Sequence, residues 1–270
     1  MDSKKVTLSG NTFSSLLVFF LFASIFCIID LQAQHFYFAQ ITDTHFDSGD
    51  NLERTEIAVQ QINALPMEIK CVVHTGDISS IKPEYKKAFG DGMAVLDKIK
   101  VPLHFVPGNH DINIKDLEAS IKNYKEKFGD LIQKVEYDGV VFIFVYTEPL
   151  RYRLSLTYFD PIKQLEEMLL KANGKPVLIF NHAPSVDDFY DNELHEGWDA
   201  EMQKKWVTLI NNYNVKAVFA GHFHRDEYHW LGNVPLFVSS SISGYWNRQA
   251  TYRIYEYNNG NISYRTQYLK

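Results

Sequence analysis

Five short polar motifs in this sequence contain the side chains that most often bind metal ions or transfer protons. Each motif includes aspartate, asparagine or histidine and directly follows an apolar run. They are Asp43-Thr44-His45, Gly76-Asp77, Gly108-Asn109-His110-Asp111, Asn181-His182 and Gly221-His222-Phe223-His224. An Asp-x-His pair is expected by chance about 0.7 times in such a chain, but Gly-Asn-His-Asp only about 0.002 times. The five motifs together therefore indicate a functional site.

The side chains of these motifs suit a limited set of metal ions. Their donor atoms are carboxylate and amide oxygens and imidazole nitrogens, without any cysteine sulfur. Such a set favours Mn, Fe, Zn or Ni over a structural tetrahedral zinc site, and it contains too much nitrogen for calcium. Six or seven ligands exceed what one ion with an open position needs. They fit two ions about 3.5–4 Å apart that share a carboxylate and clamp the attacking and leaving oxygens of a phosphoryl group. The sequence therefore predicts two divalent metal ions, Mn, Fe or Zn, as cofactors.

Hydrophobic patterns predict the elements that hold these motifs. From residue 36 onward strands and helices are expected to alternate, and after Gly221 only strands are expected. The expected strands cover 36–42, 69–74, 101–106, 140–146, 176–180, 215–220, 234–238, 251–257 and 262–268. The expected helices cover 51–65, 83–99, 116–128 and 198–213, and another begins after Asp160, its expected N-cap, with Pro161 at the first helical position.

This order of elements indicates one α/β layered domain in which antiparallel strands join the sheet late in the chain. No linker interrupts the pattern. Ligands of α/β sheets bind beyond the carboxyl ends of the strands, and each motif directly follows an expected strand. We therefore expect five strands to deliver the motifs to one rim.

Composition restricts the partners of the protein. The 270 residues are 46% hydrophobic and 22% charged, which is ordinary for a globular protein with a sizeable core. A net charge of −6 and the lack of a Lys/Arg cluster argue against general nucleic-acid binding. Cys71 is expected to be a small core residue, and no disulfide framework is expected.

The N-terminus has the pattern of a cleaved signal peptide. Lys4 and Lys5 precede an apolar run over 16–29, and Ala33 is a small residue at a suitable cleavage position. The run is short for a membrane span, which needs about 20 apolar residues. We therefore expect a signal peptide over 1–34, a globular domain over 35–270 and a secreted or periplasmic protein without stable membrane insertion after cleavage. An uncleaved N-terminal membrane anchor is the alternative.

The five motifs resemble those of the calcineurin-like metallophosphoesterase family. The resemblance covers about residues 36–270, and residues 214–244 look like the branch with cyclic-nucleotide phosphodiesterase-like and serine/threonine phosphatase-like members. It implies a four-layer αββα sandwich, in which two mixed β-sheets are flanked by helices and a di-metal site lies at the carboxyl ends of strands.

The resemblance also implies a role for each motif residue. Metal one would be held by Asp43, His45, Asp77 and His224. Metal two would be held by Asp77, Asn109, His182 and His222. The catalytic residues would be His110, which contacts the substrate phosphate and protonates the leaving group, and Asp111, which orients His110.

The implied activity is hydrolysis of phosphoester bonds by a hydroxide that the two metal ions activate. The phosphorylated substrate stays open between a phosphomonoester, a phosphodiester and a phosphoprotein. The alternative is a catalytically silent, metal-binding interaction protein on the same fold. The intact ligand set and the presence of His110 with Asp111 argue against this alternative.

Features outside the motifs have two interpretations each. His74 and His104 lie within expected strands and are expected to be structural histidines. Arg225 is expected to be ion-paired or solvated rather than to contact phosphate. The segment 244–252 forms either a packed loop at a sheet edge or a wall of the substrate site. The acidic run over 187–199 forms either a solvated loop or a charged lid.

One position bears on the oxidation state of the metals. Purple acid phosphatases, in the same superfamily, have a tyrosine three residues after the bridging aspartate, and its phenolate binds Fe³⁺. The position here is Ser80. A serine hydroxyl is a much poorer ligand than a phenolate, because its proton is far harder to remove. We therefore expect a pair of divalent ions and a colourless protein.

Overall fold

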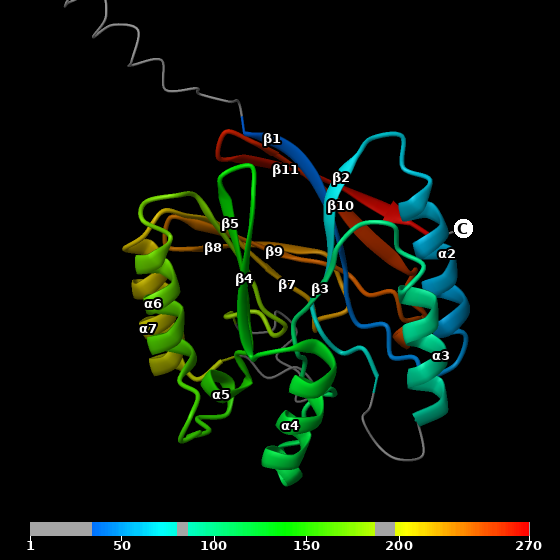
Figure 1. The fold of residues 1–270 in the computed structure, drawn as a ribbon, viewed down its shortest axis with the longest axis horizontal. Helices are drawn as coiled ribbons and strands as arrows, with labels where there is room; N and C mark the ends of the chain where they lie inside the picture. The colour runs from blue at the N-terminus through cyan, green and yellow to red at the C-terminus, as the bar shows by residue number, and fades with distance from the viewer. Residues whose placement is uncertain (1–33, 80–85, 187–197, 270) are drawn as a thin grey trace, which may run out of the picture. The chain divides into compact units, whose positions relative to one another are not determined.

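The strands of the computed structural model form two mixed β-sheets (Figure 1). The structure describes residues 34–79, 86–186 and 198–269, which belong to the unit Gln34–Lys270. The expected signal peptide, apart from residue 34, and most of the acidic run, over 187–197, lie outside the described residues. Within the described ranges, no helix has the length and apolar character that a membrane crossing requires.

Each sheet combines parallel and antiparallel strands. The first sheet has the order β11 (Asn261–Tyr268), β10 (Thr251–Asn258), β1 (His35–Ile41), β2 (Ile69–His74) and β3 (Leu103–Phe105). The second has the order β4 (Ile132–Tyr137), β5 (Val140–Val145), β6 (Val177–Phe180), β7 (Val215–Ala220), β9 (Val234–Val238) and β8 (Glu227–Leu231). Strands β1 to β3 are parallel, as are β5, β6, β7 and β9. The motif-bearing strands therefore end at the same edge of each sheet.

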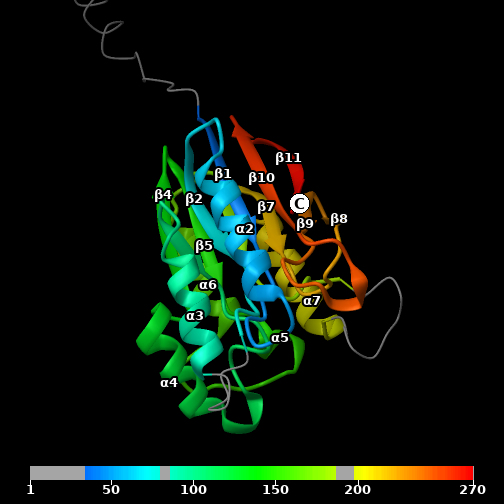
Figure 2. The same cartoon turned by 90° about the vertical axis from the view of Figure 1, so that its right-hand side faces the viewer.

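Helices cover the outer face of each sheet. Helices α2 (Asn51–Asn63) and α3 (Lys86–Leu96) pack on the first sheet and lie nearest the viewer in Figure 2. Helices α6 (Pro161–Lys171) and α7 (Ala200–Asn211) pack on the second sheet. Two further helices, α4 (Leu117–Phe128) and α5 (Glu148–Arg151), follow β3 and β5. The expected αββα sandwich is confirmed.

Aromatic rings fill much of the space between the sheets. Phe38 of β1 contacts Phe142, Phe180 and Phe219 of the second sheet edge-on, with centroid distances of 5.4, 5.8 and 5.4 Å. Cys71 is buried in the same layer as a free thiol, and burial raises the pKa of that thiol to about 12. Because such rings pack at the density of an organic crystal, this layer holds the two sheets together.

Local sequence signals place the start of α6 correctly. The Asp160 carboxylate accepts a hydrogen bond of 3.1 Å from the backbone N–H of Lys163, and Pro161 occupies the first turn. Asp160 thus satisfies one of the backbone donors that a helix N-terminus leaves open. Leu165 and Leu169 then face the second sheet.

The hydrophobic pattern does not predict β4, β8 or α5. In β4 and β8, exposed and partly buried residues alternate, because both are outer strands of the sheet. They therefore lack the continuous apolar run that identifies the central strands. In α5 all four residues are buried, and four residues are too few to show a helical period.

Candidate metal centre

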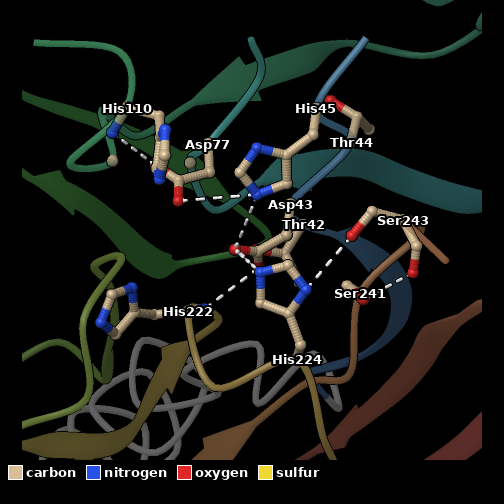
Figure 3. A network of polar contacts seen from close by, with 12 residues as sticks. Thr42, Asp43, Thr44, His45, Asp77, His110, His222, His224, Ser241 and Ser243 are labelled. Carbon is tan, nitrogen blue, oxygen red and sulfur yellow. Dashed lines mark hydrogen bonds and ion pairs between the residues drawn. The ribbon is translucent and has the colours of Figure 1, made fainter. Parts of the chain in front are cut away.

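Polar side chains from five strand ends meet at one edge of the two sheets. Figure 3 shows side chains that follow β1, β2, β3 and β7. Strands β1, β2 and β3 of the first sheet lead into three of the motifs, and β6 and β7 of the second sheet lead into the other two. The seven predicted metal ligands all lie in this cluster: Asp43, His45, Asp77, Asn109, His182, His222 and His224. Six of them are buried, and Asn109 is partly buried.

Asp43, His45 and His224 form the first group of donors. One donor atom from each lies within 4.8 Å of the other two. His224 Nε2 is 3.2 Å from Asp43 Oδ1, and His45 Nε2 is 3.9 Å from the same oxygen. Two residues of this group follow β1 in the first sheet, and the third follows β7 in the second sheet.

Asp77, His182 and His222 form the second group, and their donor atoms also lie within 4.8 Å of one another. His182 Nε2 is 3.2 Å from Asp77 Oδ2 and 3.2 Å from His222 Nδ1. Asn109 Oδ1 lies 3.1 Å from His182 Nε2, so the amide oxygen adds a fourth donor. This group also combines strand ends from both sheets.

Asp77 contacts both groups. Its Oδ2 atom lies 3.2 Å from His182 Nε2 in the second group and 3.8 Å from His45 Nε2 in the first. The Asp77 carboxylate is therefore in the position that a ligand shared by two metal ions requires.

Two buried atoms of the first group fit a metal ion. In the described part of the chain, Asp43 Oδ1 and His45 Nε2 are shielded from solvent and make no hydrogen bond, although Asp43 Oδ1 lies in the ion pair of 3.2 Å with His224. A buried polar atom without a hydrogen bond is costly, so native proteins rarely leave one unsatisfied. A bound cation would satisfy both atoms, and their oxygen and nitrogen chemistry matches the divalent ions predicted from the sequence.

Electrostatics prepare most of the donors as ligands at neutral pH. Burial raises the pKa of Asp43, but the nearby His224 and His182 imidazoles together outweigh burial and hold the pKa below its usual range. Burial lowers the pKa of His45 to about 4, so its imidazole is neutral at pH 7. Burial opposes a charge on His182, but the Asp77 carboxylate prevails and raises the His182 pKa to about 10. A metal ion bound by His182 must therefore displace a proton.

At the motifs, the backbone adopts a left-handed conformation that residues other than glycine rarely adopt. Five predicted ligands have φ between 42° and 69°: Asp43, His45, Asp77, His222 and His224. Each such residue costs on the order of 1–3 kcal/mol unless surrounding structure enforces the conformation. Backbone strain of this kind concentrates at functional sites, and here all five strained residues belong to the two donor groups.

Two motif glycines are required by close approach. A Cβ atom at Gly221 would clash with the Thr42 hydroxyl and would lie 2.7 Å from Asp43 Oδ2. At Gly76, which has φ of 101°, a Cβ atom would lie 2.6 Å from His182 Nδ1. Gly76 and Gly221 therefore make room for ligand side chains that come from the opposite sheet.

Hydrogen bonds to the far nitrogen orient two of the histidine rings. His182 Nδ1 is 2.8 Å from the Thr75 carbonyl oxygen, and His224 Nδ1 is 3.2 Å from Ser243 Oγ (Figure 3 shows the latter). Each bond directs the Nε2 atom of its ring toward the donor groups, as is usual for metal-binding histidines. His74 lies beside the site, where its Nε2 is 3.0 Å from Thr44 Oγ1, and burial lowers its pKa to about 3.

His110 and Asp111 differ sharply in environment. His110 is exposed, its ring lies edge-on to His45 with centroids 5.0 Å apart, and its backbone N–H donates to Asp77 Oδ1 over 2.9 Å. Asp111 is buried, and its carboxylate accepts backbone N–H bonds from Gly108, Asp77 and Ile78 at 2.8, 2.8 and 2.9 Å. This geometry does not support the expectation that Asp111 orients the His110 ring. Asp111 instead holds together the loops that follow β2 and β3.

The loop after β9 contributes a ring to the site. Tyr245 lies edge-on to His45, with centroids 5.1 Å apart, and 5.7 Å from the His224 ring. Of the two interpretations of this loop, this position favours a wall of the site. Arg225 forms an ion pair with Glu227, in agreement with the ion-paired alternative for that residue.

Sequence reasoning missed polar groups at two places near the site. Glu148 and Arg151 are buried, form an ion pair of 3.3 Å and follow β5, the neighbour of the His182 strand. The signal available was their position directly after an apolar strand, which they share with the five motifs. Gln40, within β1, is fully buried. A single amide in an apolar run offers no spacing pattern by which it could be found.

Comparisons with known proteins agree with the site geometry. The family model for calcineurin-like phosphoesterases matches residues 36–226. The serine/threonine-protein phosphatase CPPED1 of Bos taurus is 28% identical over 242 residues, covering 77% of this chain and 75% of that protein. A probable cyclic nucleotide phosphodiesterase of Fibrobacter succinogenes is 26% identical over 211 residues, covering 75% and 78%. A dimetal phosphatase from Danio rerio has the same fold, with a TM-score of 0.62 at 15% identity, covering 87% of this chain and 99% of that chain.

Proposed function

Because the chain belongs to the calcineurin-like phosphoesterase family and is thus a hydrolase, we propose that it cleaves phosphoester bonds at two divalent metal ions. The position of Asp77 between the two donor groups is the observation that carries this proposal. Two separate metal sites would need no shared carboxylate. Two ions that act on one phosphoryl group lie close together, and a shared carboxylate holds them there.

Each ion has four protein ligands in this proposal. Asp43, His45, Asp77 and His224 would hold the first ion. Asp77, Asn109, His182 and His222 would hold the second. Mn, Fe or Zn suits these nitrogen and oxygen donors. When bound, the pair supplies positive charge that activates water and stabilises the phosphoryl oxygens.

The side chains around the metals divide the remaining tasks. His110 is the exposed imidazole at the rim, which suits it to contact substrate and to give a proton to the leaving oxygen. Asp111 acts on the backbone, because its carboxylate ties Gly108 to Asp77 and Ile78. Tyr245 borders the side of the first donor group.

Phosphomonoesters are the substrates that we place first. The phosphatase CPPED1 of Bos taurus is similar over three quarters of its own length, and its name supports a phosphomonoester on a serine or threonine. The Fibrobacter relative supports phosphodiesters as the second class. A net charge of −6 opposes binding of nucleic acids in general.

We propose secretion or periplasmic export for this enzyme, from the Lys4–Ala33 pattern in the sequence. N-terminal sequencing of the protein recovered from its native compartment tests this proposal. A mature chain that starts at Gln34 or His35 is expected. Membrane-bound protein that still contains residues 16–29 would instead indicate the anchored alternative.

The function is tested by measuring turnover of an aryl phosphomonoester and of an aryl phosphodiester. Mn²⁺, Zn²⁺ and Fe²⁺ are supplied separately to metal-free protein. We expect activity to appear only with metal, with two ions bound per chain, and to be higher on the monoester. Asp77→Asn should abolish activity and reduce the bound metal, whereas His35→Ala, at the start of β1, should change neither. Inactivity toward both esters with two ions bound would contradict the proposed function.

A further inference from the structure

Both donor groups depend on how the two sheets stack. Asp43 and Asp77 follow β1 and β2 of the first sheet, whereas His182, His222 and His224 follow β6 and β7 of the second. A shift of one sheet against the other would therefore change the distances within each group. The apolar interior resists separation of the sheets, but rings alone do not fix one polar alignment, since apolar contact is not directional.

Gln40 is a directional link between the sheets at this place. It lies on β1, three residues before Asp43, and is fully buried. Its Nε2 atom donates to Thr75 Oγ1 over 2.8 Å and to the Ala220 carbonyl oxygen over 2.9 Å. Thr75 directly precedes Gly76-Asp77, and Ala220 directly precedes Gly221-His222. One amide therefore joins β1 to the strand ends that carry ligands in both sheets.

The orientation of the Gln40 amide is determined by its partners. The Ala220 carbonyl can only accept, so it must face the amide nitrogen. On the other side, Gln40 Oε1 accepts from the Tyr255 hydroxyl over 2.9 Å, and Arg253 Nη1 donates to that hydroxyl over 3.3 Å. Both N–H donors and one oxygen lone pair of Gln40 are thus satisfied.

The chain of polar groups beyond Gln40 is also buried and anchored. Tyr255 and Arg253 have no exposed surface, and Tyr255 stacks on Phe38 with centroids 5.0 Å apart. Arg253 Nη2 lies 3.1 Å from Asp226 Oδ1, two residues after His224. In an apolar surrounding each such bond is strong, and each lost partner is expensive. The alignment that keeps the hydrogen bonds among Gln40, Tyr255 and Arg253 is therefore preferred.

Thr75 connects this chain to a predicted metal ligand. Its hydroxyl accepts from Gln40, and its carbonyl oxygen lies 2.8 Å from His182 Nδ1. A displacement of Thr75 would therefore move His182 as well as the following Asp77.

We propose that Gln40 is a positioning residue that sets the spacing between the ligand-bearing strand ends of the two sheets. This inference rests on the proposed binding of two metal ions. Without the Gln40 amide, the protein folds and retains its ligands, but the two donor groups no longer hold the spacing that binds a coupled pair.

Titration of metal-free protein with Mn²⁺ tests this role independently of activity. In Gln40→Met, which keeps the volume but removes every hydrogen bond, we expect the weaker ion to bind about 10–100-fold less tightly, as for other residues that support metal ligands. Electron paramagnetic resonance of the Mn²⁺ form should show isolated ions in place of part of the coupled pair. A merely structural role would lower thermal stability and leave both readouts unchanged.

A pair of tyrosines on β10 provides a milder variant with a matched control. Tyr255→Phe keeps the Gln40 amide but removes its donor, together with the acceptor of Arg253 Nη1. We expect roughly fivefold weaker binding of the same ion, the equivalent of one ordinary hydrogen bond. Tyr252→Phe is the control, because Tyr252 is equally buried but packs with α2 and α3 on the opposite face of the sheet. Its hydroxyl makes no hydrogen bond within the described residues.

The outcomes separate this inference from the proposed function. If the wild type binds two coupled ions, and Gln40→Met and Tyr255→Phe bind them equally well, the positioning role alone is overturned. Wild-type protein that binds fewer than two ions would overturn the proposed function and this inference with it. If Gln40→Met does not fold, the comparison of Tyr255→Phe with Tyr252→Phe decides.

Discussion

Single residues at the site differ in what surrounds them, and His110 is the one motif histidine that is exposed. Its ring lies beside His45, although only its backbone N–H contacts Asp77. Replacement of the ring by alanine should therefore leave the donor groups intact. We expect His110→Ala to retain both metal ions while kcat falls about 10²–10⁴-fold, the usual contribution of a general acid. Metal analysis and steady-state kinetics measure the two effects.

The control for this variant is His35→Ala, because His35 is also exposed but lies at the start of β1, away from the strand end that carries Asp43. Its metal content and kcat should equal those of the wild type. Loss of a metal ion from His110→Ala would mean that His110 is a ligand.

The oxidation state of the metals is a second question of residue type. Ser80 lies three residues after Asp77 in the sequence. Its hydroxyl cannot provide the anionic oxygen that favours Fe³⁺. We expect protein purified without chelator to contain divalent ions and to lack a strong visible band. A band in the green-to-yellow region, together with iron in the protein, would contradict a divalent pair.

The sequence predicts the residues of the cluster better than the residues that support it. Asp, Asn and His in short motifs after strands can be recognised because their types and spacing are rare by chance. Gln40 cannot be recognised in this way, because its partners Thr75 and Ala220 lie 35 and 180 residues away. Its role depends on the stacking of two sheets, which no local pattern specifies.

At the scale of elements, the motifs work because strand ends come within contact distance of one another. Gly221 illustrates this, since a side chain there would meet the Thr42 hydroxyl and the Asp43 carboxylate. We expect Gly221→Ala to displace the Asp43 carboxylate and to weaken metal binding by at least about tenfold, the lower range for a disturbed ligand support. Calorimetric titration with Mn²⁺ measures this change.

Gly90→Ala is the matched control for this substitution. Gly90 lies within α3, and a Cβ atom added there would have open space around it, so the same methyl group should not touch the site. It should leave metal binding unchanged and raise the free energy of unfolding by about 0.5–1 kcal/mol, as expected for glycine replacement inside a helix. Equal metal affinities in the two variants would refute the close-approach argument for Gly221.

Element prediction succeeds where burial makes the pattern strong. The central strands β1, β5, β6 and β7 are apolar on both faces because the domain has four layers, so their runs are nearly continuous. The outer strands β4 and β8 lack this signal because solvent reaches one of their faces. Such strands form through pairing with β5 and β9, which is a tertiary effect.

For the whole molecule, the location of the site between two sheets links metal binding to global stability. Both donor groups combine residues of the first and the second sheet, so neither group can exist once the sheets separate. Ions that bind only the folded state raise the free energy of unfolding by about 2.7 kcal/mol for each site at 100 times its dissociation constant. We expect this gain in denaturant titrations with Mn²⁺ relative to chelator, with a single transition in both conditions. Asp77→Asn, which replaces the shared carboxylate by a neutral amide, should show little of it. A metal-dependent gain confined to one of two separate transitions would mean that the sheets unfold independently and that one sheet alone holds the ions.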